Sequence, residues 1–426
     1  MRWPYGTLSR VPAVGALQLL GTMMDRRDLL IRSAAGLGAL SGATAAFPSR
    51  AARAASHEPF PRVRPEEVGL SSAGLDRIPE QMREFVRQNK IAGAVTLVAR
   101  HGKLAHFVAV GDADIEMRKK MRTDSIFWLA SQAKPTTATA IMVLVDQGKV
   151  RLDEPVATYL PAFKNIKLKS GSAPQKPPTV RHVMSHTAGL AQPFRDPNDG
   201  AYTLAQYANR LASRPLEFEP GSAYEYGYGL TVCGGIVEAV SGKLFEDFLE
   251  ANVFGPAGMK DTTFNPTREQ WPRLTKTYKP GPNGAIVPAY NPFITQDWTV
   301  KRFPEPSGGL LSTTGDMARF YQMYLNGGEI DGRRILSREA VQTVTTPQMA
   351  GGKPITYALG WQTVPPPATG GARVLSGYGH GGAFATDGFI DPSRGLVTVL
   401  MIQRTQFPNG GEIGAAFRKL VAEALG

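Results

Sequence analysis

The feature that most constrains the fold is a short segment that is apolar on every side. Residues 136–145 read TTATAIMVLV, and Ile141, Met142 and Leu144 cover more than one face of a helix. A helix that is apolar all round has to be buried, so the rest of the chain must enclose it. Pro135 is compatible only with its first turn, and Gly148 predicts its end.

The chain is large enough to build such an enclosure. Its 426 residues, 42% hydrophobic and 20% charged, indicate about two domains or one large composite domain. No repeat or low-complexity tract argues for a repeat protein or for disorder. The single cysteine, Cys233, excludes an intrachain disulfide, and its apolar, glycine-rich surroundings indicate a core residue.

Residues 1–55 have the composition of an export signal and leader. The pair Arg26-Arg27 precedes an apolar stretch of small residues at 29–46, and Ala-x-Ala sites follow at 43–45 and 52–54. This pattern is typical of a twin-arginine signal, and it is too short and too rich in glycine and alanine for a membrane span. The residues before Met23 are atypical of such a signal, which indicates Met23 or Met24 as an alternative start. We therefore predict a protein exported to the periplasm, with a catalytic domain at 56–426 and no stable membrane span in the mature form.

Charge and histidine content exclude several classes of partner. The leader holds seven arginines and two aspartates, a net charge of +5, so the formal +12 of the chain leaves +7 for the mature part. Its basic residues are dispersed and lack interleaved aromatics, so nucleic acid is not expected as a partner. The six histidines do not form a compact metal set, and no His-Glu-x-x-His occurs. The GYGHGG sequence at 377–382 leads into a strand-like run, which argues against a dinucleotide site.

Both ends of the mature chain predict parts of one antiparallel sheet. A helical pattern at 69–90 precedes two β-rich runs, 94–100 and 103–110, which are joined by His101-Gly102. Near the C-terminus, strand-like runs at 388–391 and 395–403 flank Pro392-Ser393-Arg394, and 412–425 predicts a closing helix. We predict an α+β fold with an antiparallel sheet built from both chain ends, flanked by helices and interrupted by a mostly helical insertion at about 115–300. A site is expected at the seam between sheet and insertion.

A serine and a lysine lie where the apolar helix begins. Ser131 is at its N-terminal edge, and Lys134, three residues later, shares its face. A desolvated lysine beside a hydroxyl loses preference for its charged form and can act as a base, while helix N–H groups favour negative charge. The alternative is a serine cap in a four-residue pattern that arises by chance, so further partners are needed.

Two later segments supply candidate partners. In PGSAYEYGYGL, Tyr226 precedes an apolar helix, and a nearby cationic lysine would favour the ionised phenol, which could shuttle a proton. Gly381 and Gly382 follow His380, so a substrate could lie against this strand edge with a backbone N–H facing an oxyanion. The alternatives are a packing tyrosine and a glycine-rich turn into a hairpin.

In this order, the three motifs resemble those of the serine β-lactamase and penicillin-binding superfamily. They are Ser131-x-x-Lys134, Tyr226-Gly227-Tyr228 and His380-Gly381-Gly382. The resemblance is closest to the class C β-lactamase-like branch, which includes family VIII carboxylesterases and D-Ala-D-Ala peptidases. Residues 180–190 and 308–328 are similar to connecting segments of that branch.

The resemblance implies a β-lactamase/transpeptidase-like fold and specific roles for the motif residues. Ser131 would be acylated, with Lys134 and Tyr226 as the base pair. The backbone N–H groups of Ser131 and Ala383 would form the oxyanion hole, and no metal or organic cofactor would be needed. Trp128 is expected to pack near the site, whereas His182 and His186 are expected to form local hydrogen bonds.

Two departures from the pattern bear on the substrate. Class C β-lactamases typically carry the motifs Tyr-x-Asn and Lys-Thr-Gly. In this chain Tyr228 stands in place of the asparagine and His380 in place of the lysine. A phenol and a mostly neutral imidazole thus replace an amide and a fixed cation that would bind a β-lactam. We expect hydrolysis of carboxylic esters, and these residues are compatible with weak action on some β-lactams. The alternatives are a class C-type β-lactamase or D-Ala-D-Ala carboxypeptidase acting on amides, an acyltransferase, and a non-enzymatic penicillin-binding or sensor protein.

Overall fold

The computed structural model describes residues 58–190, 203–291, 297–366, 374–405 and 411–425. They belong to one unit that spans residues 55–426. The predicted export signal and the two alternative start residues lie outside the described ranges. No helix within these ranges is long and apolar enough to cross a membrane.

A seven-stranded sheet is the largest element, and the two ends of the chain meet in its middle. The strand order is β12-β13-β14-β15-β1-β2-β3, and all neighbours pair antiparallel. β1 pairs with β15 in the register Val95↔Met401 and Leu97↔Val399, which confirms a sheet built from both chain ends. The strands are β1 Gly93–Arg100, β2 Lys103–Asp114, β3 Lys119–Lys120, β12 Gln362–Val364, β13 Gly377–Gly381, β14 Asp387–Asp391 and β15 Leu396–Met401.

Both predicted hairpins are present. His101 and Gly102 join β1 to β2 with φ of 52° and 72°, the two left-handed residues that a tight two-residue hairpin requires. β14 and β15 are joined by a 3₁₀ turn, η8 Pro392–Arg394, in which the Asp391 carboxylate accepts a hydrogen bond from Arg394 N–H. The hairpin signals in the sequence were therefore sufficient to pair these strands.

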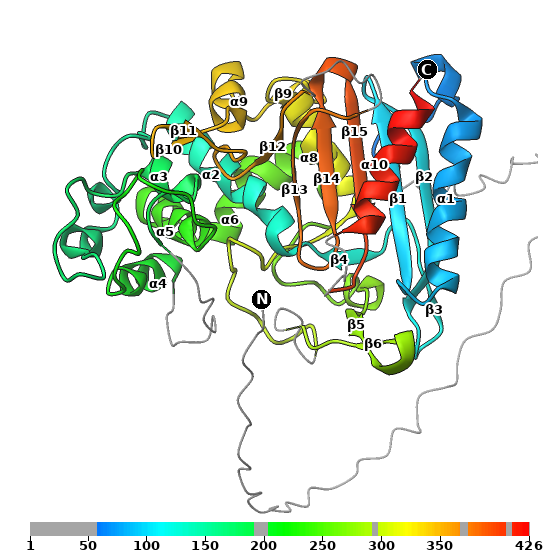
Figure 1. Ribbon diagram of the computed structural model, residues 1–426, viewed down its shortest axis with the longest axis horizontal. Coiled ribbons are helices and arrows are strands. Elements are labelled where there is room, and N and C mark those ends of the chain that lie inside the picture. Colours follow the sequence, from blue (N-terminus) through cyan, green and yellow to red (C-terminus); the bar gives the residue numbers. More distant parts are fainter. Residues whose placement is uncertain (1–57, 191–202, 292–296, 367–373, 406–410, 426) are drawn as a thin grey trace, which may run out of the picture. The chain divides into compact units, whose positions relative to one another are not determined.

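Helices cover both faces of the sheet (Figure 1). On one face α1 Ser72–Arg87 packs beside the terminal helix α10 Glu412–Ala424, and on the other lies α8 Thr314–Leu325. The apolar residues of α1 that share one face are all buried, in a cluster with residues of β1, β15 and α10. This arrangement confirms the α+β class with helices flanking an antiparallel sheet.

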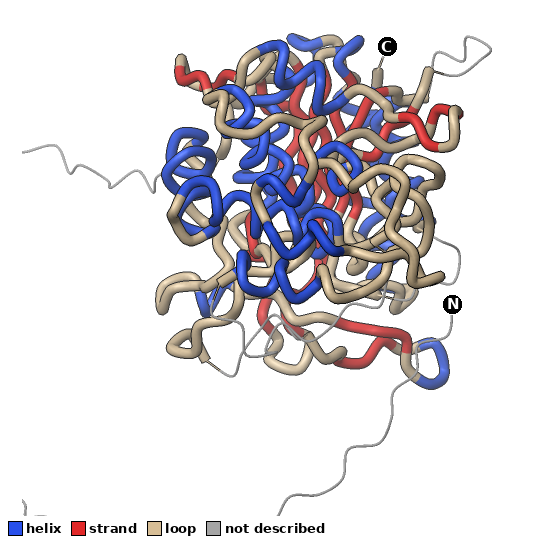
Figure 2. Tube along the Cα trace, turned by 90° about the vertical axis from the view of Figure 1, so that its left-hand side faces the viewer, coloured by secondary structure: helices blue, strands red, loops and turns tan. Residues whose placement is uncertain are grey.

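No described residue from 121 to 361 belongs to this sheet, and the regular structure of this interval is mainly helical, with long loops between the helices (Figure 2). This interval is longer than the predicted 115–300 because it includes α8, which covers the sheet itself. Its other helices are α2 Lys134–Asp146, α3 Val180–Met184, α4 Leu204–Leu211, α5 Gly229–Ser241, α6 Phe245–Leu249, α7 Gly255–Ala257 and α9 Arg338–Thr345. Its two-stranded pairs are β4 Ile126–Trp128 with β7 Leu311–Thr313, β5 Tyr278–Pro280 with β6 Ile286–Pro288, β8 Glu329–Ile330 with β9 Arg333–Arg334, and β10 Met349–Ala350 with β11 Lys353–Pro354.

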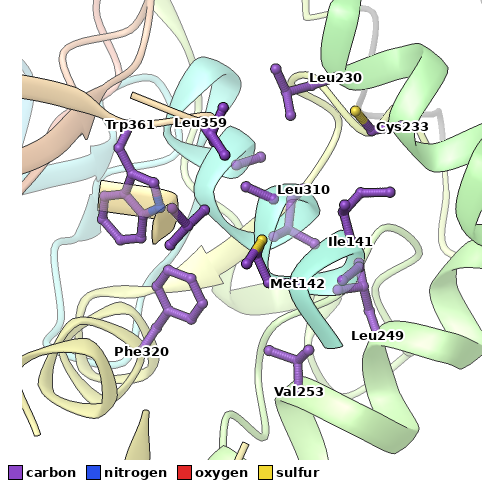
Figure 3. Close-up of a cluster of buried hydrophobic side chains, with 14 of the residues drawn as sticks. Ile141, Met142, Leu230, Cys233, Leu249, Val253, Leu310, Phe320, Leu359 and Trp361 are labelled. Atoms are coloured by element: carbon purple, nitrogen blue, oxygen red, sulfur yellow. The ribbon is translucent and has the colours of Figure 1, made fainter. Parts of the chain in front are cut away.

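Helix α2 lies in the interior, as its composition predicts. Every residue from Lys134 to Leu144 is buried. Figure 3 shows Ile141 and Met142 among Leu230 and Cys233 of α5, Leu249 of α6 and Trp361, which come from segments far apart in the sequence. Packing on all sides fixes the start of α2, and with it the position of Lys134.

Candidate active site

The turn before α2 presents Ser131. After β4 the chain enters a 3₁₀ turn, η2 Ala130–Ala133, that runs directly into α2. Ala130 has φ of 49°, a left-handed conformation that costs free energy for a residue with a Cβ. The first bond of the turn is from Gln132 N to Leu129 O, at 3.2 Å. The N–H of Ser131 precedes that bond and so has no acceptor within the turn.

Lys134 is buried against Ser131. Its side chain is 3% exposed, and Nζ lies 3.0 Å from Ser131 Oγ and 2.7 Å from the backbone oxygen of Ser307. Burial lowers the pKa of Lys134 to about 7, and the charge of Glu305 opposes that shift. Near neutral pH the neutral amine is therefore well populated, and it is placed to take the Ser131 proton.

Glu305 is a buried carboxylate behind Lys134 that the sequence analysis did not identify. Its Oε1 accepts hydrogen bonds from the Thr231 hydroxyl at 2.6 Å and from Ser307 N–H at 2.9 Å. Burial raises the pKa of Glu305, whereas these bonds and the Lys134 charge lower it. A single glutamate in Pro-Glu-Pro belongs to no recognised motif. The sequence therefore gave no signal that Glu305 would lie behind Lys134 and affect its pKa.

Tyr226 lies on the other side of the lysine, just before α5. Its ring centroid is 4.7 Å from Lys134 Nζ. Burial raises the pKa of Tyr226, and the nearby Ser131 hydroxyl offsets only part of the rise. Burial thus favours the protonated phenol over the phenolate that was expected beside a cationic lysine. Near neutral pH the Tyr226 phenol therefore keeps its proton, and the neutral Lys134 amine is the group of this pair that can accept one.

The end of β13 is in contact with the turn that carries Ser131. A Cβ on Gly382 would lie 2.2 Å from both Leu129 O and Thr386 Oγ1, so only glycine fits here. The Gly382 N–H donates to Thr386 O at 2.7 Å, and the Thr386 hydroxyl donates to Leu129 O at 2.8 Å. The next residue, Ala383, consequently lies close to the start of η2. Its pairing with Ser131 N–H in an oxyanion hole remains a prediction.

His380 is neutral and internally bonded. It is 2% exposed, and burial together with the Lys134 charge lowers its pKa to about 3. Nδ1 lies 2.7 Å from Gly381 O, and Nε2 lies 3.1 Å from the Tyr357 hydroxyl. The third motif therefore presents no positive charge, in line with the neutral imidazole that was expected.

The two other predicted substrate-contact residues, Tyr228 and Trp128, are held in the protein interior. Tyr228 is 4% exposed, and burial raises the pKa of its phenol, with a further rise from Tyr207 of α4 and an opposing effect of Arg214. Trp128 donates from Nε1 to Gly308 O, and its ring centroid is 4.6 Å from that of Phe384, the residue after Ala383. Trp128 thus packs beside the site, and the Tyr228 phenol is close enough to Tyr207 and to Glu305 for their charges to affect its pKa.

Two residues that were not predicted for the site, His186 and Tyr357, pack against Tyr226. Their ring centroids are 4.4 Å and 6.2 Å from that of Tyr226. His182 bonds locally, to Thr179 N–H, as expected. The same expectation for His186 was wrong: it accepts from Gly227 N–H and contacts Tyr357, 171 residues away. Only the fold brings these segments together.

The site brings together three side chains that can exchange protons. Within the described ranges, no three or more His, Cys, Asp or Glu residues are arranged to hold a metal ion. A serine, a neutral amine and a protonated phenol meet at the seam between the sheet and the helical region. The fold and this site define a serine hydrolase.

Comparison with known proteins gives the family. The model of the beta-lactamase family matches residues 78–423, and the chain belongs to that family. It is 35% identical over 215 residues to esterase EstB of Burkholderia gladioli, which covers 47% of this chain and 54% of EstB. It is 29% identical to penicillin-binding protein 4 of Amycolatopsis lactamdurans, over 80% of this chain and 86% of that protein. The structure of a family VIII carboxylesterase is similar with a TM-score of 0.66 and 21% identity, over 84% of this chain and 99% of that one.

Proposed function

We propose that the protein hydrolyses carboxylic esters of small molecules through an acyl-enzyme on Ser131. The observation that carries this proposal is the pairing of a buried Lys134 amine with Ser131 in a site whose third motif holds a neutral histidine. Similarity to esterase EstB and to a family VIII carboxylesterase supports the same choice.

The groups of the site are sufficient for both half-reactions. Neutral Lys134 takes the Ser131 proton while Oγ attacks the ester carbonyl carbon, and the carbonyl oxygen becomes an oxyanion. The N–H groups of Ser131 and Ala383 would stabilise that charge. Collapse breaks the bond to the alcohol oxygen, which leaves with a proton from Tyr226, and the lysine restores the phenol. Water then attacks the acyl-enzyme by the same route and releases the carboxylic acid and Ser131.

The electrostatics of the third motif favour esters over β-lactams and peptides with a free carboxylate. Such substrates carry a negative charge that needs a cation, and a lysine at position 380 would supply one. Here His380 is neutral, and both of its ring nitrogens are bonded within the protein. An ester without a carboxylate does not require that charge, and its alkoxide leaves more readily than an amide nitrogen.

The second candidate is a D-Ala-D-Ala carboxypeptidase or β-lactamase activity. It is favoured by similarity to penicillin-binding protein 4 over most of both chains. It uses the same three catalytic groups and differs only in the leaving group and in recognition of the carboxylate.

Mass spectrometry of the acyl-enzyme tests these alternatives. The protein is treated briefly with p-nitrophenyl butyrate or with nitrocefin, and turnover of both is recorded. The proposal predicts acylation of the wild type and of Ser170→Ala, which changes an exposed serine, but not of Ser131→Ala. Faster turnover of nitrocefin would favour the second candidate, and absence of any label on Ser131 would refute the catalytic assignment. A new ester formed on addition of an alcohol would indicate an acyltransferase.

We also propose that residues 1–55 direct export to the periplasm. The paired Arg26-Arg27, the apolar stretch and the Ala-x-Ala sites support this proposal. Fusion of residues 1–55 to a reporter that is active only after export tests it. The Arg26→Lys, Arg27→Lys double variant should abolish export if the signal is of the twin-arginine type.

A further inference from the structure

Four hydrogen bonds connect the loop after Tyr226 to the strand that ends at the site. Gly227 N–H donates to His186 Nδ1 at 3.2 Å, and His186 Nε2 lies 3.2 Å from the Tyr357 hydroxyl. The same hydroxyl lies 3.1 Å from His380 Nε2, and His380 Nδ1 lies 2.7 Å from Gly381 O. All three side chains are buried, with at most 3% of their surface exposed.

The two backbone groups at the ends set the direction of every bond between them. A backbone N–H can only donate, so His186 Nδ1 is unprotonated and its proton is on Nε2, which donates to the Tyr357 oxygen. A carbonyl can only accept, so His380 Nδ1 carries the proton and Nε2 is the acceptor. Tyr357 then accepts from one histidine and donates to the other. Burial lowers the pKa of both histidines, so each keeps a single proton.

The hydroxyl of Tyr357 is the part of this chain of bonds that serves both histidines. One O–H group accepts one hydrogen bond and donates another, which the two tautomers require. A lysine at position 380 would have donors and no acceptor, so it could not receive the Tyr357 hydrogen. Histidine at 380 therefore supplies the acceptor that the Tyr357 hydroxyl needs for its hydrogen.

Gly381 and Gly382, at the end of this chain of bonds, have no side chains that could fix their conformation. Gly381 and Gly382 precede the predicted oxyanion donor, Ala383, and glycine has the widest choice of backbone conformations. Gly381 N–H donates to Gln362 Oε1 at 3.2 Å, and Gly381 O receives the His380 bond. The N–H and the carbonyl of Gly381 are thus each bonded to a side chain. The carbonyl is bonded to His380, which is itself bonded to the Tyr357 hydroxyl.

We propose that Tyr357 is a positioning residue that holds the Tyr226 loop and the Gly381–Ala383 segment at a set separation. This inference rests on the proposed function, because the two connected segments carry the proton donor and an oxyanion donor. Tyr357 acts through the two histidines. It stabilises the geometry in which Ser131 Oγ attacks an electrophile bound at the site.

The tautomers provide a test that does not depend on activity. Long-range ¹⁵N–¹H spectra of histidine-labelled protein at pH 7 should show His186 protonated on Nε2 and His380 protonated on Nδ1, both neutral. Their signals are assigned by their loss in His186→Gln and His380→Gln. The opposite tautomer for either histidine, or an imidazolium, would overturn the hydrogen-bond chain.

The positioning role is tested with Tyr357→Phe, which removes the hydroxyl and keeps the ring. Tyr324→Phe is the matched control, because Tyr324 is equally buried and bonds to Thr139 in the interior. We expect phosphonylation of Ser131 by a fluorophosphonate, and kcat on p-nitrophenyl butyrate, to fall about 10- to 100-fold in Tyr357→Phe, with KM within about twofold. The control should keep wild-type rates.

The outcomes separate this inference from the proposed function. Equal rates for the two variants would refute the positioning role even if the tautomers are as expected. If the wild type is phosphonylated but hydrolyses no ester, the proposed substrate class fails, while the phosphonylation rates still decide the role of Tyr357. If Ser131 is not phosphonylated, the catalytic proposal and the positioning role fail together, and the tautomers decide the hydrogen-bond chain alone.

Discussion

The carboxylate behind Lys134 should control the pH at which the enzyme becomes active. Acylation requires neutral Lys134, so the rate should rise with pH and level off above the pKa of about 7. Glu305 stabilises the ammonium by its negative charge and so raises that pKa. Glu305→Gln removes the charge but retains an oxygen that can accept from Thr231 and Ser307. The pKa of Lys134 should then fall, and the acidic limb of the pH profile should move to lower pH.

The size of the shift follows from the hydrogen-bonded path between the two groups. Glu305 Oε1 accepts from Ser307 N–H at 2.9 Å, and Lys134 Nζ donates to Ser307 O at 2.7 Å. Two unit charges about 7 Å apart, at an effective dielectric constant of about 20, interact by about 2.4 kcal/mol, or about 1.7 pH units. We expect a shift of about one to two pH units.

The assay is the rate of acylation by p-nitrophenyl butyrate in the pre-steady state, measured from pH 5 to 9 at constant ionic strength. Glu238→Gln is the matched control, since Glu238 is also a buried carboxylate but accepts from Ala205 N–H and Phe245 N–H, away from Lys134. Its profile should coincide with that of the wild type. An unchanged or upward-shifted acidic limb in Glu305→Gln would show that the reasoning about Lys134 is wrong.

Three further predictions concern other parts of the chain. Tyr226→Phe should lower the acylation rate about 100-fold, because it removes the proposed proton donor. The rate is measured by stopped flow at saturating ester, and a much smaller loss would show that another group donates the proton. Burial lowers the pKa of His106 to about 4, so below pH 6.5 the unfolded state binds more protons than the folded state. The free energy of unfolding should therefore fall by about 3 kcal/mol between pH 6.5 and pH 4. Urea titrations should show a smaller loss in His106→Gln, and an equal loss would exclude His106 as the cause. Ile141→Ala should cost about 2–5 kcal/mol in the same titrations, because Ile141 is fully buried in α2.

Local patterns in the sequence determined the elements of the fold and the three motifs. The alternation and turn residues around His101-Gly102 specify a hairpin, since strand pairing across a short turn depends only on neighbouring residues. In the same way, a helix that is apolar on all sides must be enclosed, whatever surrounds it. Ser131 and Lys134 are three residues apart, so their contact follows from helix geometry.

Only the tertiary structure decided the protonation states and the supporting residues of the site. Tyr226 stays protonated because of the depth at which its phenol is buried, and burial is a property of the whole fold. Glu305 and Tyr357 reach the site across long separations in the chain, 173 residues between Lys134 and Ser307 and 171 between His186 and Tyr357. Contacts at such separations leave no periodic pattern in the sequence. The contact between Ser131 and Lys134 was therefore predictable from local spacing, whereas the pKa of Lys134 and the residues that support the site depend on how distant segments pack.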